Sequence, residues 1–240
     1  QISMASYRGA ATLSAIAMPP TGTHTDDYHA PLQQWLTDYE LDTGTSKIKP
    51  YDPTVGQRIA DMVRPQFGEA VPTDEEAIHK SFGYGWWKPN PQAAEELLTA
   101  AGFTKNGNQW LMPDGQPFTF TIKTFTEGVI NRMGTGVAQQ WSQQGIQVTA
   151  EVAPFIFRDD LPEGNFEAAT AWSIETWGGN PDLSYFIDSW HSSYVAEPGS
   201  RQPPRNWQRW QDERLDAVIE KVRQTDFSDH EANVAIGTEF

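Results

Sequence analysis

The pattern of apolar and polar residues predicts a strand, a helix and a second strand in the middle of the chain. Apolar and polar residues alternate in segments 118–125 and 146–152, which is typical of half-buried strands. Between them, apolar residues recur at helical spacing from Ile130 to Trp141, and Gly145 predicts the end of that helix. Because a helix that joins two such strands forms a right-handed crossover, we expect the two strands to run parallel.

The residue pattern predicts further elements before and after this strand–helix–strand unit. Asn90, which a proline follows, predicts the start of a helix, and Gly102 predicts its end. A third strand is expected over residues 166–174, and a final amphipathic helix over residues 215–222. Strands that alternate with helices predict the α/β class.

The earlier part of the chain is less regular. We expect residues 1–89 to be the irregular, loop-rich part of the same folded unit that has residues 90–240 as its α/β core. A short helix is predicted over residues 54–63, and Pro65 is expected to end it because proline breaks the helical hydrogen bonding. Residues 67–89 are expected to be irregular as well.

Composition and charge exclude several classes of partner. The 240 residues include 17 basic and 32 acidic side chains, for a formal net charge of -15. This balance argues against nucleic acid and against an anionic membrane surface, because both are bound by clustered cations. No apolar run approaches the roughly 20 residues of a spanning helix, so we expect no membrane span.

The absence of cysteine and the form of the two ends add to this picture. With no cysteine, disulfide scaffolds, zinc ribbons and thiol catalysis are all excluded. The chain opens without an initiator Met or a basic and then apolar leader, and it stops within an apparent element. We therefore expect a fragment of a longer protein, without a signal peptide in this part.

Candidate chemistry in the chain is sparse. No nucleophile elbow, phosphate-binding loop or zinc-protease signature is present, so we expect no catalytic residues and no cofactor. His24, Asp26, Asp27 and His29 lie close together, but their spacing matches no metal motif. A solvated loop is the better interpretation of this segment, and we expect no metal.

Paired acids leave an enzyme as one alternative. Glycoside hydrolysis needs two carboxylates that face each other across a bond, and Glu163, Glu167 or Glu175 could supply such a pair. With 32 acidic residues in the chain, some pair will always look suitable. A carbohydrate hydrolase is thus kept only as an alternative to a binding protein.

Ten tryptophans are the informative excess in the composition. Trp110 and Trp141 are predicted to lie in the core. Several others stand in loops, where a large apolar ring with one polar edge suits stacking on sugar rings or other amphipathic ligands. The tryptophans that we expect to face a ligand are Trp86, Trp87, Trp172, Trp177 and Trp190.

Two loops are expected to meet at the carboxyl edge of the sheet, where open α/β folds bind ligands. One loop follows the strand that ends near Phe125 and carries Glu127 into a helix N-terminus, which favours an acceptor. The other follows the strand near Ile174 and carries Glu175 and Trp177. Glu127, Glu175 and Trp177 are therefore predicted to bind the ligand.

Several motifs in this order resemble a known family. They are NPQAAEELLTAAGFTKNGNQW, VAQQWSQQGIQVTAEV, GNFEAATAWSIETWGGNPD and NWQRWQDERLDAVIEKV. Together they resemble the large C-terminal lobe of the family 5 extracellular solute-binding proteins, from about Asn90 to Val222 and more loosely back to the opening residues. The resemblance implies a lobe of the type II periplasmic-binding-protein fold, with a mixed sheet and flanking helices.

The resemblance also implies a function. Proteins of this family capture oligopeptides, dipeptides, nickel or oligosaccharides in a two-lobed clamp and deliver them to the membrane permease of an ABC importer. It thus implies a periplasmic or lipid-anchored extracellular protein, a monomer, with a small-molecule solute and permease subunits as partners. A sensor or chaperone that has taken over this lobe is a further alternative.

One departure from the family bears on the ligand. Peptide binders of the family carry an Asp that pairs with the α-amino group of the peptide, and Trp177 occupies the matching position here. A tryptophan would leave a buried ammonium unpaired, which costs several kcal/mol. The resemblance therefore favours an oligosaccharide-like or other neutral solute over a peptide, although an oligopeptide-binding protein remains an alternative.

The segment NWQRW is expected to be mainly structural. Asn206 and Arg209 resemble the part of the family that leads into the last helix. There the arginine is expected to pair with a carboxylate, while Trp207 or Trp210 covers the edge of the core.

Overall fold

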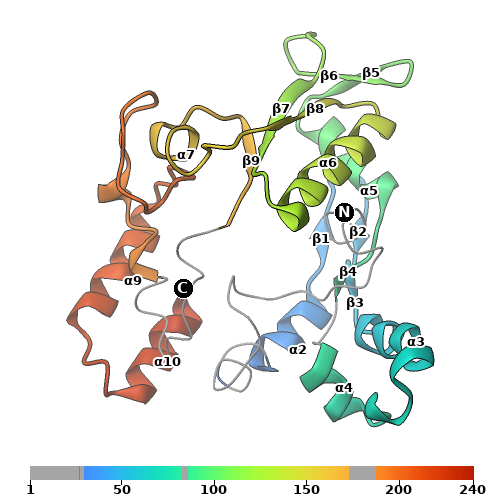
Figure 1. Ribbon diagram of the computed structural model, residues 1–240, viewed down its shortest axis with the longest axis vertical. Coiled ribbons are helices and arrows are strands. Elements are labelled where there is room, and N and C mark those ends of the chain that lie inside the picture. Colours follow the sequence, from blue (N-terminus) through green and yellow to red (C-terminus); the bar gives the residue numbers. More distant parts are fainter. Residues whose placement is uncertain (1–26, 28–29, 83–85, 173–186) are drawn as a thin grey trace.

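A parallel three-stranded sheet with one crossover helix forms the centre of the fold (Figure 1). The computed structural model describes residues 27, 30–82, 86–172 and 187–240. The elements of the sheet are β7 (Thr119–Thr124), α6 (Gly128–Gln143), β8 (Gln147–Val152) and β9 (Ala168–Thr170). β7 lies between β8 and β9 and pairs with both in parallel, so the predicted strand–helix–strand unit is confirmed.

Both parallel and antiparallel pairing occur in the described residues. The three central strands are parallel, and antiparallel pairing occurs in three two-stranded sheets and in an isolated bridge between Leu111 of β6 and Pro117, just before β7. β9 is shorter in the described residues than the predicted segment 166–174. The α/β class itself is confirmed.

The crossover helix α6 packs directly on the sheet. Ile122 of β7 and Val137 and Ala138 of α6 form a buried cluster, against which Trp141 packs as predicted. A Cβ atom added at Gly134 would lie 2.6 Å from Thr170 Oγ1 and 2.9 Å from Thr124 Cβ. Glycine at this position therefore lets the helix approach β7 and β9 closely.

A helix and a hairpin precede the sheet. They are α5 (Pro91–Ala100), β5 (Thr104–Asn106) and β6 (Gln109–Leu111). Asn90 Oδ1 accepts a hydrogen bond of 3.1 Å from the Ala93 N–H, and Gly102 follows the helix with φ of +88°, so both predicted ends are confirmed. Trp110 of β6 is buried, as predicted.

Residues before α5 are more regular than expected. Their described elements are α2 (Ala30–Asp38), β1 (Leu41–Asp42), β2 (Lys47–Ile48), β3 (Tyr51–Asp52), α3 (Val55–Phe67), η2 (Gly68–Ala70), α4 (Glu75–Phe82) and β4 (Trp86–Trp87). The loop-rich expectation is therefore wrong for the described part of this region. The missed α4 had a signal, because Asp74 accepts a hydrogen bond from the Ala77 N–H and acidic residues fill the first turn.

Pro65 lies within α3 and does not end it. A proline removes one helical hydrogen bond, and near the end of a helix this loss affects only the last turn. Arg64 supports that turn, because its guanidinium donates hydrogen bonds of 3.1 Å and 3.0 Å to the Val71 and Pro72 carbonyls. The helix then ends at Phe67, and Gly68 follows it with φ of +55°.

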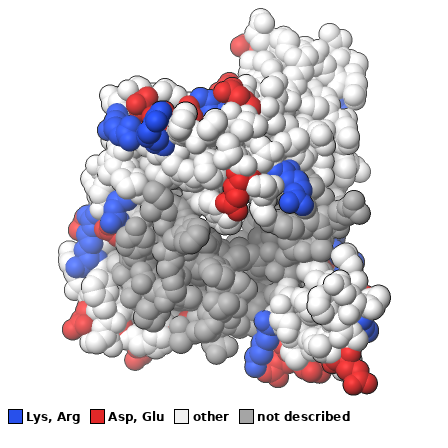
Figure 2. All heavy atoms as spheres, in the orientation of Figure 1, with Lys and Arg blue, Asp and Glu red and all other residues white. Residues whose placement is uncertain are grey.

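Acidic side chains gather over α3 and α4, at the lower right in Figure 2. The exposed acids of residues 55–82 are Asp61, Glu69, Asp74, Glu75 and Glu76. Part of the large negative charge of the chain is thus concentrated on one surface, which repels polyanions.

Further helices follow β8 along the chain. They are α7 (Asp160–Glu163), η3 (Ser192–Tyr194), α9 (Glu213–Gln224) and α10 (His230–Glu239). The predicted amphipathic helix is confirmed as α9, which buries Val218, Ile219 and Val222, but it is not the final helix because α10 packs after it. No helix of the described residues is long and apolar enough to cross a membrane.

The NWQRW segment, residues 206–210, comes shortly before α9 in the chain. Trp207 is 5% exposed and belongs to a core cluster with Ile156 and Leu161. Asn206 is fully buried at φ of +45°, and its side chain binds the Trp210 N–H and carbonyl. The structural role predicted for Trp207 fits this burial.

Arg209 differs from the expectation of a carboxylate partner. Its guanidinium donates to backbone carbonyls, including those of Pro162 at 3.1 Å and Ala196 at 3.2 Å. Burial lowers the pKa of Arg209. Arg209 therefore ties the end of α7 to the loop before α9 through the free carbonyls that a helix end presents.

Candidate ligand-binding site

The carboxyl edge of the sheet brings the predicted loops together. Beyond the strands, the Phe125 N–H donates to the Thr170 carbonyl at 3.1 Å, and the Ala153 N–H donates to the Thr124 carbonyl at 2.8 Å. The three chain segments thus stay hydrogen-bonded up to the point where their loops begin. Side chains that leave this edge are held on a rigid support.

Glu127 and Trp172 meet at this edge. Glu127 is the residue before the first turn of α6, but its carboxylate makes no capping bond there. Instead, Glu127 Oε2 accepts a hydrogen bond from the Trp172 indole N–H, across 45 positions of sequence. The Trp172 side chain remains 39% exposed. The contact satisfies the polar end of the indole and holds an exposed ring in one place.

An aromatic cluster supports the loops of this edge from below. The Phe125 and Phe157 rings lie 4.9 Å apart in an edge-on arrangement, and the Phe157 and Trp207 rings lie 5.9 Å apart. Phe125 and Phe157 pack against buried Ile156 and Leu161. The loop after β7 is therefore anchored to the segment that follows β8.

A neighbouring ion pair neutralises one charge on the sheet and one on α7. Lys123 Nζ of β7 lies 2.5 Å from Asp160 Oδ1 of α7, and both side chains are largely buried. Each group is the other's partner, so neither offers an unpaired charge to a ligand. The described part of the edge is thus aromatic and hydrogen-bonding in character.

The other predicted ligand residues divide into two groups. Glu175 and Trp177 lie outside the described residues, as do the side chains of Trp86 and Trp87, whose backbone forms β4 against β3. Trp190 packs against the buried cluster that α9 forms with Ile187. Of the predicted set, the structure brings together Glu127 and Trp172.

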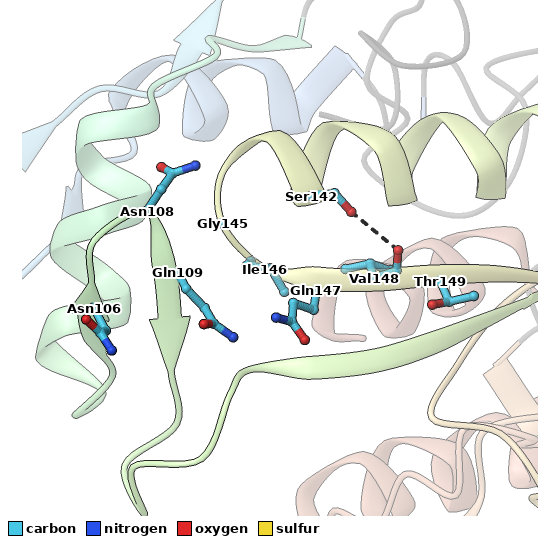
Figure 3. A pocket seen from close by; sticks show the side chains of 9 residues that line it. All are labelled: Asn106, Asn108, Gln109, Ser142, Gly145, Ile146, Gln147, Val148 and Thr149. Carbon is cyan, nitrogen blue, oxygen red and sulfur yellow. Dashed lines mark hydrogen bonds between the residues drawn. The ribbon is translucent and has the colours of Figure 1, made fainter.

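The amino edge of the sheet holds a polar cavity that the sequence did not reveal. Its volume is about 520 Å³, and it lies between the β5–β6 hairpin and the start of β8 (Figure 3). The polar side chains around it are uncharged: Asn106, Asn108, Gln109, Ser142, Gln147 and Thr149. The sequence did show part of this site, because Gln147 and Thr149 are the polar residues in the alternating pattern of β8. Only the folded structure shows that the hairpin lies beside them.

The residues of the two alternative chemistries are described only in part. His24, Asp26 and His29 lie outside the described residues, and His230 Nε2 lies 3.5 Å from Asp27 Oδ2. Among the described residues, no group of three or more histidine or acidic side chains could hold a metal. Glu167 accepts a hydrogen bond of 2.9 Å from the Thr121 N–H, which extends the pairing of β9 along β7.

More than half of the chain matches a protein-family model. Residues 55–197 match the model described as bacterial extracellular solute-binding proteins, family 5 Middle. This range includes the whole central sheet and Glu127 and Trp172. No curated protein sequence matches the chain.

Solved structures show the same fold. The structure of NikZ from Campylobacter jejuni, in complex with Ni(L-His), matches with a TM-score of 0.52 at 19% identity, over 64% of this chain and 29% of that one. A periplasmic oligopeptide-binding protein from Thermotoga maritima matches with a TM-score of 0.54 at 17% identity, over 65% of this chain and 29% of that one. The same protein bound to mannohexaose gives 0.52 at 18% identity, over 65% and 29%. The match thus covers less than a third of each of these proteins.

Proposed function

The chain belongs to the bacterial extracellular solute-binding proteins of family 5, and from this we propose that it is part of the substrate-binding component of an ABC importer. In this proposal the carboxyl edge of the β8–β7–β9 sheet faces the solute. The observation that carries it is the hydrogen bond between Glu127 and Trp172, which holds an exposed indole at the edge where open α/β sheets bind ligands.

A neutral, oligosaccharide-like solute suits this edge best. The exposed face of Trp172 can stack on the apolar face of a sugar ring, and its N–H is already satisfied. The Glu127 carboxylate is engaged by the indole, which makes it a weaker partner for the α-amino group of a peptide. Trp177, at the position where peptide binders carry Asp, is proposed as a second stacking residue.

The proposed role is binding without catalysis. The family consists of transport binding proteins. A permease in the membrane would receive the solute, and the protein would act as a monomer outside the cytoplasmic membrane, in the periplasm or anchored by a lipid.

We also propose that a second lobe, outside this chain, completes a two-lobed clamp. A clamp gains affinity by burying the ligand on both sides, and the matched region covers 29% of the NikZ chain. This chain alone is therefore expected to bind any solute more weakly than micromolar. Calorimetry that found tighter binding by the chain alone would contradict the clamp.

The test uses the two-lobed protein with Trp172→Ala and, as a matched control, Trp210→Ala. Trp210 is also exposed, at 54%, but it lies in the segment before α9. We expect Trp172→Ala to lower the affinity for a neutral oligosaccharide about tenfold, with little change in melting temperature. Trp210→Ala should leave the affinity unchanged.

Two results would reject the proposal. One is an unchanged affinity with a clear drop in melting temperature for Trp172→Ala, which would make this ring a packing residue. The other is a two-lobed protein that is stabilised by oligopeptides and by no neutral saccharide, which would leave the transport role but exclude the ligand class.

A further inference from the structure

A second, apolar cavity lies at the amino edge of the sheet. Its volume is about 800 Å³, and it is lined by α5, β6, the last turns of α6 and the starts of β7 and β9. β7 has six residues, so its two ends are about 17 Å apart at 3.3 Å per residue. The cavity is therefore distinct from the edge that carries Trp172.

Aromatic rings form one wall of this cavity. Phe118 and Phe120 have ring centroids 5.7 Å apart, and Phe120 meets Trp141 edge-on at 5.5 Å. Trp110 and Leu98 add further apolar surface. A cavity of this size and character matches the pockets that bury small organic molecules.

The charges at the cavity are of one sign. Among its described lining residues, Glu95 and Glu167 carry charges, and no lysine or arginine is present. Each carboxylate has more acceptor sites than its one observed partner uses, since Glu95 Oε1 binds Lys105 Nζ at 2.5 Å and Glu167 Oε2 binds the Thr121 N–H. The partner of Glu167 is a neutral N–H, so this carboxylate keeps its charge for a further donor, whereas Lys105 already neutralises Glu95.

The hairpin already shows how a cation fits beside this wall. Lys105 Nζ lies 4.9 Å from the centroid of the Trp110 ring while it pairs with Glu95. An ammonium is thus stabilised here by a carboxylate and by the electron-rich face of an indole. Lys105 does not line the cavity, but its ammonium neutralises Glu95, so Glu167 is the lining carboxylate with no cationic partner among the described residues.

We propose that this cavity binds a small molecule with an aromatic or aliphatic body and a single ammonium group. The body would fill the space between α5 and the aromatic wall, and the ammonium would lie near Glu167. The negative charge of the chain, -15 in total, favours the approach of such a cation.

The test compares three probes that share one ring system and differ in charge. They are 1-naphthylmethylamine, 1-naphthalenemethanol and 1-naphthoate, each used to displace the fluorescent N-phenyl-1-naphthylamine from the protein. We expect the amine to bind about fivefold more tightly than the alcohol and the naphthoate to bind most weakly. Equal affinities, a preference for the naphthoate or no displacement by any probe would overturn the proposal.

Substitutions in the cavity test whether the amine binds there. Ala94→Trp should fill the cavity and lower binding of the amine at least about tenfold, whereas the exposed Thr99→Trp on the same helix should not. Glu167→Gln keeps an acceptor for the Thr121 N–H, and it should reduce the preference for the amine over the alcohol. An amine preference that survives Glu95→Gln combined with Glu167→Gln would reject the charge argument even if Ala94→Trp does not fold.

The outcome is independent of the proposed transport function. Trp172→Ala, at the other edge, should leave binding of the amine unchanged. Loss of amine binding in that variant would show that the probe occupies the carboxyl edge, and would reject the cavity as its site.

Discussion

The two edges of one parallel sheet differ in how they are closed. At the carboxyl edge, loops leave the strands and an exposed Trp172 is held by Glu127. At the amino edge, the β5–β6 hairpin and α5 pack beside the strand starts and line an apolar and a polar cavity. One edge is thus built from single side chains on loops, and the other from packed elements.

This difference has a consequence for mutation. At an edge built from loops, loss of an exposed side chain changes ligand binding more than it changes stability. At an edge closed by packed elements, the same kind of change disturbs the fold first. The support beneath the carboxyl edge should behave like the packed edge, because its rings are buried.

The largest effect is expected for Trp207→Ala. Trp207 is 5% exposed and packs on Phe157 beneath the carboxyl edge, so its removal leaves a cavity. We expect a loss of about 3–5 kcal/mol in the free energy of unfolding, measured by chemical denaturation. Trp210→Ala is the control and should change stability by less than about 1 kcal/mol. A larger effect on ligand affinity than on stability would mean that Trp207 faces the cleft.

Gly145→Ala should have the next largest effect on stability, and this effect should arise at the amino edge of the sheet. Gly145 has φ of +90°, and an added Cβ would lie 1.8 Å from the Asn108 carbonyl oxygen of the hairpin. We expect a loss of about 3 kcal/mol, because the backbone strain and the displacement of the hairpin add.

Gly115→Ala separates the two causes. Gly115 has φ of +81°, but no atom lies within 4 Å of an added Cβ. This control should therefore lose only the strain, about 1 kcal/mol. Equal losses in urea titrations of the two variants would show that the hairpin does not press on Gly145.

Glu127→Ala should have a smaller effect, on affinity alone. Without the carboxylate, the Trp172 indole loses its fixed orientation, and the affinity of the two-lobed protein for its solute should fall about threefold. Glu127→Gln keeps an acceptor for the indole N–H and should restore most of the affinity. If the glutamine variant is as weak as the alanine variant, Glu127 acts through its charge and not by positioning Trp172.

Acid should weaken the region after β9 before it weakens the apolar amino edge. Burial tends to raise the pKa of Asp188, but hydrogen bonds from Arg223 and Tyr194 outweigh this effect, so the pKa is lowered. Burial also tends to raise the pKa of Asp216, and hydrogen bonds from Ser192 lower it in the same way. A lowered pKa in the folded state gives stability that is complete above pH of about 4 and is lost as the pH falls through the folded value.

Hydrogen exchange at two pH values measures this difference. Amides of α9 should lose protection at low pH, while those of α5 and β6 keep theirs. In Asp188→Asn, the acid-dependent part of the loss in α9 should shrink. Uniform loss of protection across both regions would mean that the chain unfolds as one unit in acid.

Much of the central sheet could be read from local pattern. The alternation in β7 and β8, the spacing in α6 and the stop at Gly145 depend on neighbours in sequence, and each was confirmed. Asn90 as a cap is equally local. A local signal was misleading where contacts with a later segment opposed it. Pro65 was expected to end α3, but Arg64 holds the last turn of that helix by a hydrogen bond to the following loop.

What the sequence determined by itself was the α/β class, the parallel pair, the loop that carries Glu127 and an excess of tryptophan suited to ligands, because these follow from residue type and short-range spacing. What the tertiary structure decided was which of these side chains meet. Only the folded chain places the Trp172 indole on Glu127, turns Arg209 onto backbone carbonyls, and sets the hairpin over the amino edge. Such contacts join residues that lie tens of positions apart, and no periodicity within one segment records which distant segment it will face.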